Sequence, residues 1–397
     1  MDLTEEAKKL NDELIRYRRY LHEHAEVGFA MNQTKEFVKN KLREIGLEPK
    51  DCGISGITAQ IRGKSERTIL LRADMDALPI HEDTGLSFAC KTNNMHACGH
   101  DMHTAMLLGA AKLLVQRADS LNGTVRLMFQ PAEEVLLGAK NMIENGILDH
   151  PKPDAAIMIH VSADRSIGTV RLAQEGVVAP AADTFEIQVH GLACHGSVPY
   201  KGINALTAAA HILLALQQIP AQEVGTEHPS ALSVGRLHGG DAANAVADLA
   251  VLNGTLRSFD IKTQENMKFR IRQIAEGVAS AFRATATVTF PGGCPPFENN
   301  TMVKQTVESA IRKQMRGINI IYSTGRSISG SEDFAFVSQH VPSALISLSC
   351  GANDHPLHHP KVEFDENALW MGAGIYAAAA MEFLTIDWSE HNERQKN

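Results

Sequence analysis

The segment HDMHTAMLLGAAKLLVQRA (residues 100–118) decides the fold class, because it reads as an apolar helix set between two apolar strands. Its apolar side chains recur at helical spacing, whereas RTILLRADMDALPI (67–80) and TVRLMFQP (124–131) are strand-like runs that end in loops. The same alternation continues with a helix over 138–148 and a strand over 154–162. Alternation of this kind predicts βαβ units and an α/β fold with a mainly parallel sheet.

The middle of the chain has a different pattern. We expect strands over 183–191, 231–240, 249–259 and 285–290, and helices over 203–219 and 263–284. The resulting order, β-α-β-β-α-β, is that of a split βαβ, or ferredoxin-like, unit. Such a unit folds independently, so we interpret it as an insertion.

The last part of the chain returns to the first pattern. PGGCPP (291–296) is rich in Pro and Gly and predicts the return linker. Helices over 297–315 and 367–384 and a strand over 343–351 follow it. We therefore expect a catalytic domain over 1–181 and 294–397, interrupted by an inserted domain over 182–293.

Composition excludes several classes of protein. The net charge of −8 argues against a nucleic-acid-binding surface, which needs Lys and Arg against phosphate. The first residues lack the apolar core of a secretory signal, and we expect no apolar run to approach the ~20 residues of a membrane helix. The six cysteines are scattered, which predicts reduced thiols and a cytoplasmic protein without a membrane partner.

Residues with catalytic or metal-binding side chains collect at the ends of the predicted strands. Asp74 and Asp76 follow one strand, Glu133 and Glu134 the next, and His160 ends the third. Further candidates are Cys98 and His100, just before a helix, and the histidines of NDHPLHHP, namely His355, His358 and His359. Open parallel sheets bind ligands outside the carboxyl ends of their strands. We therefore expect these clusters to converge.

A set of one thiolate, several imidazoles and several carboxylates suits a borderline divalent ion. Zinc and manganese fit best, with cobalt and nickel as alternatives. Each residue alone also has an ordinary structural interpretation. A lone cysteine beside a helix is usually a small buried apolar group, and a Glu–Glu pair is usually solvated. The metal hypothesis depends on all the clusters having the same placement.

Five motifs together resemble the M20 metallopeptidases, most closely the amidohydrolase branch with its aminoacylases, hippurate hydrolases and auxin-conjugate hydrolases. They are LRADMDALP (71–79), MHACGHDMHTAMLLGAA (95–111), FQPAEE (129–134), GSEDFA (330–335) and PLHHP (356–360). The resemblance implies a metal-dependent exopeptidase-like catalytic domain with two metal ions per subunit. It also implies that the inserted domain is a lid that mediates homodimer formation.

The resemblance also implies roles for individual residues. The metal ligands would be Cys98, His100, Glu134, His160 and His358, with Cys98 bridging the two ions. Glu133 would be the general base, and His195, reaching over from the partner subunit, would stabilise the oxyanion. Asn244 and Arg257 would contact the substrate, Arg257 through a free carboxylate. We expect Asp76 to support the ligands without binding metal.

The expected function is hydrolysis of the amide bond of an N-acyl amino acid by a metal-activated water. The nearest alternative is a dipeptidase or carboxypeptidase that uses the same site on a small peptide. A non-catalytic metal-binding protein would lack a ligand or the base. A thiol sensor centred on Cys98 would need a resolving cysteine, and Cys90 is the nearest in sequence.

Overall fold

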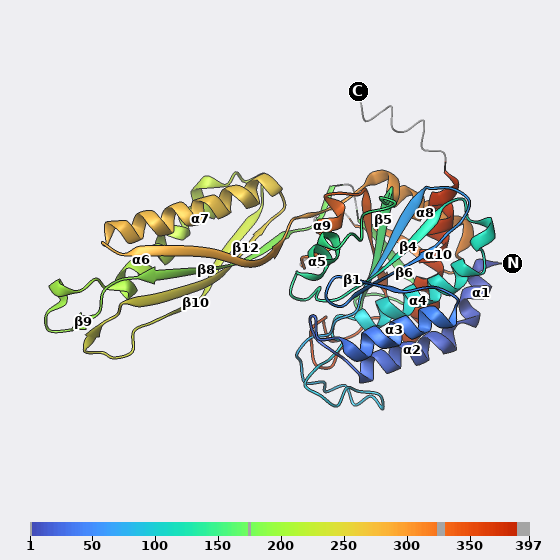
Figure 1. Ribbon diagram of the computed structural model, residues 1–397, viewed down its shortest axis with the longest axis horizontal. Helices are drawn as coiled ribbons and strands as arrows, with labels where there is room; N and C mark the ends of the chain where they lie inside the picture. Colours follow the sequence, from blue (N-terminus) through green and yellow to red (C-terminus); the bar gives the residue numbers. More distant parts are fainter. Residues whose placement is uncertain (1, 174–175, 324–329, 387–397) are drawn as a thin grey trace, which may run out of the picture. The chain divides into compact units, whose positions relative to one another are not determined.

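The computed structural model describes residues 2–173, 176–323 and 330–386, and the chain divides into two compact units (Figure 1). Unit 1 comprises Met1–Gly176, Glu298–Ser327 and Phe336–Asn397. Unit 2 comprises Val177–Phe297 and Ile328–Ala335. One stretch of chain thus interrupts another, as expected of an insertion, and the domain limits at 181/182 and 293/294 stay predictions.

Unit 1 is built on an eight-stranded sheet with the order β1-β2-β4-β3-β5-β16-β6-β15. The strands are β1 (Lys50–Cys52), β2 (Gly56–Ile61), β3 (Thr68–Asp74), β4 (Thr124–Gln130), β5 (Ala155–Ser162), β6 (Thr169–Ala173), β15 (Asn319–Ser323) and β16 (Ser343–Ser349). The four adjacent strands β4, β3, β5 and β16 run parallel, as do β6 and β15. Strands β1, β2 and β4 pair antiparallel, as do β16 and β6. The predicted α/β fold with a mainly parallel sheet is confirmed.

The helices of unit 1 pack on this sheet and on one another. They are α1 (Leu3–Lys9), α2 (Asn11–Glu23), α3 (Asn32–Glu44), α4 (His100–Val115), α5 (Gly138–Glu144), α8 (Thr301–Gln314), α9 (Ala335–Ser338) and α10 (Leu369–Thr385). Helix α10 contacts both α4 and α8, and α4 contacts β3 and β5. Nearly every residue of α4 is buried. A helix that is apolar on all sides belongs in a core. The core therefore holds α4, including the end that carries His100.

One expectation from the sequence is wrong. The segment Glu366–Thr385 is long and apolar enough to cross a membrane by length and composition, although we expected no such run. Of its most apolar window, 78% is buried inside the structure. Helix α10 contributes Ile375, Tyr376 and Phe383 to the apolar core of unit 1. The segment is therefore accounted for as the core helix of a folded domain.

Unit 2 contains the predicted β-α-β-β-α-β order. Its four-stranded antiparallel sheet has the order β10-β12-β8-β13, from β8 (Ala181–His190), β10 (Ser230–Gly239), β12 (Leu249–Ser258) and β13 (Thr285–Cys294). Helices α6 (Ala205–Leu216) and α7 (Ile261–Ala281) pack against this sheet (Figure 1). Ile187, Ile212, Leu252 and Ile271 belong to the apolar core that they share. The remaining described strands are short: β7 (Gly176–Ala179), β9 (Cys194–His195), β11 (Ala245–Val246) and β14 (Phe297–Asn299).

The return linker differs from the prediction. Strand β13 continues through the PGG of 291–293 to Cys294, with a register shift between Thr289 and Gly292. Because β13 lies at the edge of its sheet and is bulged there, it accommodates a proline that a central strand would exclude. The predicted helix over 297–315 likewise begins later, at Thr301, where Asn300 caps it with hydrogen bonds from the backbone N–H groups of Met302 and Val303.

Candidate metal centre

The candidate residues of unit 1 meet at one edge of the sheet. Asp74 is the last residue of β3, the Glu133–Glu134 pair follows β4, and His160 lies near the end of β5. The loop after β16 carries His358, whose backbone N–H donates to the carbonyl of Ala97 at 3.0 Å. Since these four strands are parallel neighbours, their carboxyl ends lie together, as in other open α/β sheets.

A glycine turn sets the relation between Cys98 and His100. Gly99 has φ +83° and caps α4, whose first residue is His100. A Cβ at Gly99 would lie 2.3 Å from Cγ2 of Val161 on β5. Only glycine tolerates both the positive φ and the close approach of Val161 without strain, because it has no side chain and adopts positive φ freely. The turn therefore brings the thiol and the imidazole to the same strand edge.

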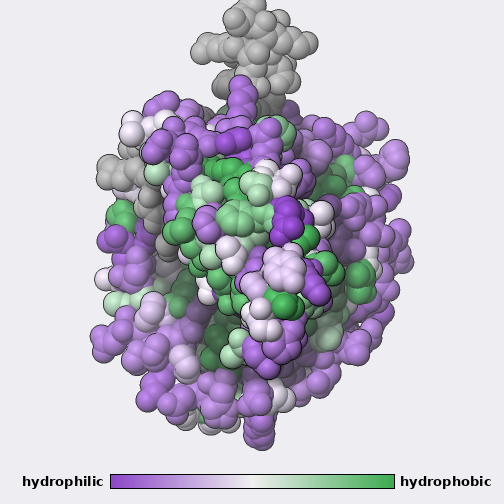
Figure 2. Space-filling view, turned by 90° about the vertical axis from the view of Figure 1, so that its left-hand side faces the viewer, coloured by the Kyte–Doolittle hydropathy of each residue, from purple (hydrophilic) through white to green (hydrophobic). Residues whose placement is uncertain are grey.

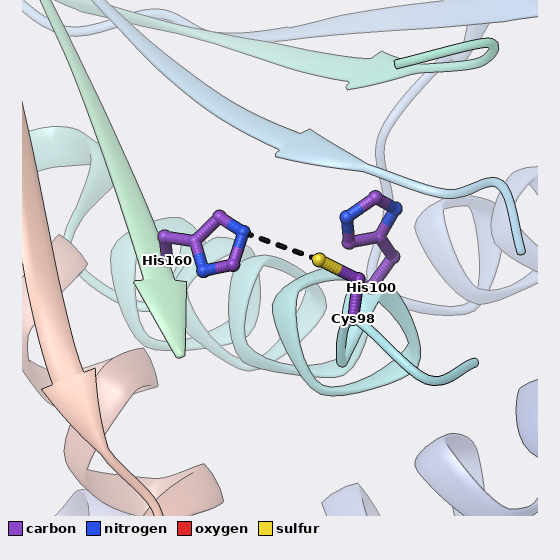
Figure 3. Close-up of side chains that lie close together, drawn as sticks. All are labelled: Cys98, His100 and His160. Atoms are coloured by element: carbon purple, nitrogen blue, oxygen red, sulfur yellow. Dashed lines mark hydrogen bonds between the residues drawn. The ribbon is translucent and has the colours of Figure 1, made fainter. Parts of the chain in front are cut away.

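Two of the groups of donor atoms that could hold a metal ion share one sulfur. Cys98, His100 and His160 make the first group, and Cys98, Glu134 and His358 the second, with all donor atoms of each group within 4.8 Å of one another. The Sγ of Cys98 is 3.6 Å from Nε2 of His160 (Figure 3) and 3.4 Å from Nε2 of His358. Glu134 spans the same space, with Oε2 3.7 Å from Nε2 of His358 and Oε1 3.8 Å from Nε2 of His100.

Hydrogen bonds on the far side of two rings select their tautomers. Nδ1 of His100 lies 2.8 Å from the carbonyl oxygen of Asp76, and Nδ1 of His160 lies 2.7 Å from that of Val161. A carbonyl accepts only, so each Nδ1 carries a proton, and each Nε2 faces the site, where its lone pair would be available to a bound metal. This is the arrangement usual for metal-binding histidines.

Two buried polar atoms of the site lack, within the described chain, the hydrogen bonds that a protein interior normally supplies. Nε2 of His100 and Oε1 of Glu134 are buried and have no hydrogen-bond partner within the described residues. Buried polar atoms are nearly always satisfied, and an orphaned one needs an explanation. Because both atoms belong to the donor groups above, a coordinated cation would satisfy them.

The charges of the site also favour a cation. Burial raises the pKa of Glu134 above its ordinary value, and the nearby His100 and His358 offset this only in part. Burial disfavours the charged form of His100, yet Asp74 and the neighbouring Asp76 and Cys98 hold its pKa well above the usual value. Acidic groups are thus crowded around these imidazoles, and divalent cations would offset their negative charge.

Asp76 supports the acidic pair through the backbone, as expected. Its Oδ1 accepts from the N–H of Glu133 at 2.9 Å and its Oδ2 from the N–H of Glu134 at 3.2 Å. Ala132, the residue before Glu133, has φ +55°, so the chain bends sharply just before the Glu133–Glu134 pair. One buried carboxylate therefore fixes the backbone of two candidate site residues.

The role of His103 was missed in the sequence. Its Nδ1 donates to Oδ1 of Asp74 at 2.5 Å, while its Nε2 accepts from the N–H of Val161 at 2.8 Å. Burial lowers the pKa of His103 to about 4, so the ring is neutral. It connects β3 with the segment of β5 beside His160. The signal available in the sequence was its spacing. His103 lies three residues after His100, so the two side chains lie on the same face of the helix.

The remaining predicted residues belong to unit 2. His195 is exposed on β9, and its Nδ1 accepts from the N–H of Ser197 at 3.1 Å. Asn244 precedes β11, which pairs with β9, and its carbonyl accepts from the N–H of Gly196 at 2.7 Å. Arg257 lies on β12, in the four-stranded sheet. His195 and Asn244 are thus neighbours, and all three lie in a different unit from the donor groups.

This fold and this donor chemistry define a metal-dependent hydrolase of the exopeptidase type. The chain belongs to peptidase family M20/M25/M40, whose model matches residues 70–382. As members of this family do, it acts as a hydrolase of amide bonds.

Similar proteins match this chain over nearly its whole length. An N-acetyl-L-cysteine deacetylase of Bacillus subtilis is 38% identical over 93% of this chain and 89% of its own length. The hippurate hydrolase of Campylobacter jejuni is 34% identical over 97% of this chain and 100% of its own. A crystal structure of a dinuclear metal-binding M20 peptidase from Bacillus subtilis has a TM-score of 0.79 and 32% identity, covering 95% of this chain and 99% of that one.

Proposed function

We propose that this protein hydrolyses the amide bond of N-acyl amino acids at a binuclear metal centre. The ligands would be Cys98, His100, Glu134, His160 and His358, and Cys98 would bridge the two ions. The observation that carries the proposal is the sharing of one sulfur by two donor groups. The mixture of thiolate, imidazole and carboxylate suits zinc or manganese, with cobalt or nickel as alternatives.

When bound, two such ions would supply Lewis acidity, polarising the scissile carbonyl and lowering the pKa of water. The protein's own groups then move the protons. Glu133 would accept a proton from the attacking water and deliver it to the leaving amine as the C–N bond breaks, giving a carboxylic acid and a free amino acid. Its Oε2 lies 4.0 Å from Nε2 of His100, at the edge of the donor groups, and Asp76 holds its backbone.

The residues of unit 2 would complete the site. In the proposal His195 donates to the tetrahedral oxyanion, Asn244 contacts the substrate, and Arg257 pairs with the substrate carboxylate. His195 would come from the partner subunit of a homodimer. Figure 2 faces the end of unit 2 that carries β9 and shows apolar side chains among the polar ones. Leu192 and Tyr200, which flank β9, are both exposed, which supports an interface there.

A cytoplasmic location is part of the proposal. The six cysteines form no disulfide with one another, and four others besides Cys98 are buried. Cys194 alone is partly exposed. Several thiols that form no disulfide are typical of a reducing compartment. The same compartment would keep the Cys98 thiolate available as a ligand.

The names of the relatives favour amino acids blocked by an acyl group. The Bacillus subtilis and Campylobacter jejuni proteins are named for N-acetylcysteine and for hippurate, two N-acyl amino acids. A thermostable carboxypeptidase of Saccharolobus solfataricus is 35% identical over 96% of this chain. A peptidase activity is therefore the second candidate function.

The decisive experiment compares two substrate sets with the metal-loaded protein. We expect cleavage of N-acyl amino acids with a kcat/KM at least about tenfold above that for unblocked dipeptides. The free amino group of a dipeptide would be a polar group without a partner in the site, and one such group lowers kcat/KM by at least about that factor. Preferred cleavage of dipeptides, or of C-terminal residues from longer peptides, would overturn the proposal in favour of the second candidate.

The variant Glu133→Gln tests the mechanism in the same assay. Its amide keeps the size of the side chain but cannot accept the proton, so turnover should fall by about 10²–10⁴-fold or more. Metal content, measured by atomic emission, should stay at two ions per subunit. A Glu133→Gln protein that keeps substantial turnover would exclude Glu133 as the base.

A further inference from the structure

Helix α2 directs two basic side chains into the interior of unit 1. The side chains of Arg18 and His22 lie one helical turn apart and are each only 2% exposed. Both contact Asp101, the residue after the proposed ligand His100. Its Oδ2 accepts from Nε of Arg18 at 2.7 Å and from Nδ1 of His22 at 2.9 Å. Because the Asp101 carboxylate is fully buried, these partners stabilise its charge, and they attach the first turn of α4 to α2.

The guanidinium of Arg18 also contacts a second segment of the chain. Its Nη1 lies 3.1 Å from Oε1 of Glu366, in the short helix Glu366–Ala368 that precedes α10. This helix follows the loop that contains the proposed ligand His358. A guanidinium holds its N–H donors in a rigid planar fork, so one side chain fixes two carboxylates relative to each other. Arg18 therefore joins the start of α4 to the segment after His358.

The loop between β3 and α4 belongs to the same network. Nε2 of His22 lies 3.1 Å from Oε1 of Glu82, and the next residue, Asp83, donates its N–H to the carbonyl of Pro360 at 2.9 Å. Carboxylates only accept, so both ring nitrogens of His22 carry protons and the ring is an imidazolium. Burial disfavours this charged form, yet the hydrogen bonds to the two carboxylates raise the pKa of His22 above its ordinary value. The loop thus gives α2 a second connection to the segment 358–366.

These connections bear most directly on His358. The rings of His100 and His160 are each oriented by a hydrogen bond to a backbone carbonyl. The side chain of His358, by contrast, is 53% exposed and extends from a loop. Its Nε2 lies 3.4 Å from Sγ of Cys98. This distance therefore depends on how the segment 358–366 is attached to the rest of unit 1.

We propose that Arg18 is a positioning residue that fixes His358 relative to Cys98 and so sets the affinity of the second metal ion. The second ion is the one that Cys98, Glu134 and His358 would hold. The inference rests on the proposed function, to which it adds a residue outside the donor groups. Arg18 acts on the start of α4 through Asp101. It acts on the segment after His358 through its other carboxylate partner.

The test compares two neighbouring arginines in the full-length protein. Arg18→Lys keeps the positive charge but lacks the planar fork that binds two carboxylates at once. Arg19→Lys is the matched control, because Arg19 pairs with the same Glu366 carboxylate through a side chain that is 48% exposed. Glu366→Gln weakens the same connection from its other end and decides the result if Arg18→Lys does not fold.

Each protein is titrated with cobalt(II) and followed by its visible absorption. We expect two ions per subunit in the wild type. In Arg18→Lys and Glu366→Gln the affinity for the second ion should fall about 10–100-fold, as is usual when a partner of a metal ligand is lost, with the affinity for the first changed by less than about threefold. His358→Ala, which lacks a ligand of the second ion, gives the reference spectrum of the first ion alone. Arg19→Lys should bind both ions as the wild type does.

Urea unfolding of the metal-free proteins separates positioning from a purely structural role. A structural role would lower the free energy of unfolding without changing the ratio of the two metal affinities. If Arg18→Lys and Glu366→Gln keep that ratio, or if Arg19→Lys changes it equally, Arg18 does not position His358, although the binuclear centre stands. If the wild type itself binds fewer than two ions, the proposed centre fails, and the positioning role with it.

Discussion

The carboxylate of Asp76 holds two acidic residues of the candidate centre without contacting their side chains. Both of its oxygens accept backbone N–H groups, from Glu133 and from Glu134. Its backbone carbonyl also accepts from the Nδ1–H of His100. Three candidate residues therefore take their position from one aspartate.

The variant Asp76→Ala should weaken metal binding. It leaves two buried N–H groups without acceptors and frees the backbone of a ligand, so metal affinity should fall about 10–100-fold. Competition with a metal chelator measures this directly. Asp76→Asn retains one acceptor oxygen and should give an intermediate loss; equal affinity of Asp76→Ala and the wild type would show that Asp76 does not position Glu134.

At the scale of elements, the turn between Cys98 and α4 depends on a residue without a side chain. Gly99→Ala would place a methyl group against Val161 at a positive φ. We expect the free energy of unfolding to fall by about 1–3 kcal/mol from overpacking, and the metal affinity to fall with it as Cys98 moves relative to His100. Urea unfolding and metal titration measure the two effects.

Gly277→Ala is the matched control for that substitution. Gly277 lies within α7, and a Cβ there would meet nothing within 4 Å. Alanine should raise the free energy of unfolding of unit 2 by about 0.5–1 kcal/mol through helix propensity. If Gly99→Ala proved as harmless as Gly277→Ala, the turn would not need glycine.

At the scale of the whole molecule, metal should stabilise the two units unequally. All five proposed ligands belong to unit 1, and unit 2 has its own apolar core. A ligand stabilises the state that binds it, by about 2.7 kcal/mol when its concentration is 100 times Kd. Removing metal should therefore raise hydrogen exchange in β3, β5 and α4 and leave β8 and β12 unchanged. Equal loss of protection in both units would contradict this assignment of the ligands.

Local patterns in the sequence predict those parts of the fold that depend on neighbouring residues. The βαβ alternation and the β-α-β-β-α-β insertion have clear periodicities, and both are confirmed. Helix α3 was not predicted; only Thr34, Val38 and Leu42 are buried along it, which is a weak apolar stripe. Strands β6 and β15 were missed because they are short and become strands by pairing with each other across 150 residues of chain (169 to 319).

The meeting of the site residues was predictable from their placement at the ends of the predicted strands, whereas their individual roles were not. The roles assigned to the residues of CGH, AEE and PLHHP come from resemblance, and the structure brings donor atoms of these three motifs together. The hydrogen bonds that orient them could not be derived from spacing. The contact of His103 with Val161 joins residues 58 positions apart, and the two bonds to Asp76 depend on the bend at Ala132.

The most direct measurement is anomalous diffraction from crystals of this protein grown with zinc or manganese. Two metal peaks should appear in unit 1, each within coordination distance of Cys98 Sγ, about 2.3 Å for zinc. His100 and His160 should bind at one ion and His358 at the other. No peak, or a pair of ions that leaves Cys98 and His358 uncoordinated, would contradict the binuclear centre and the hydrolysis that depends on it.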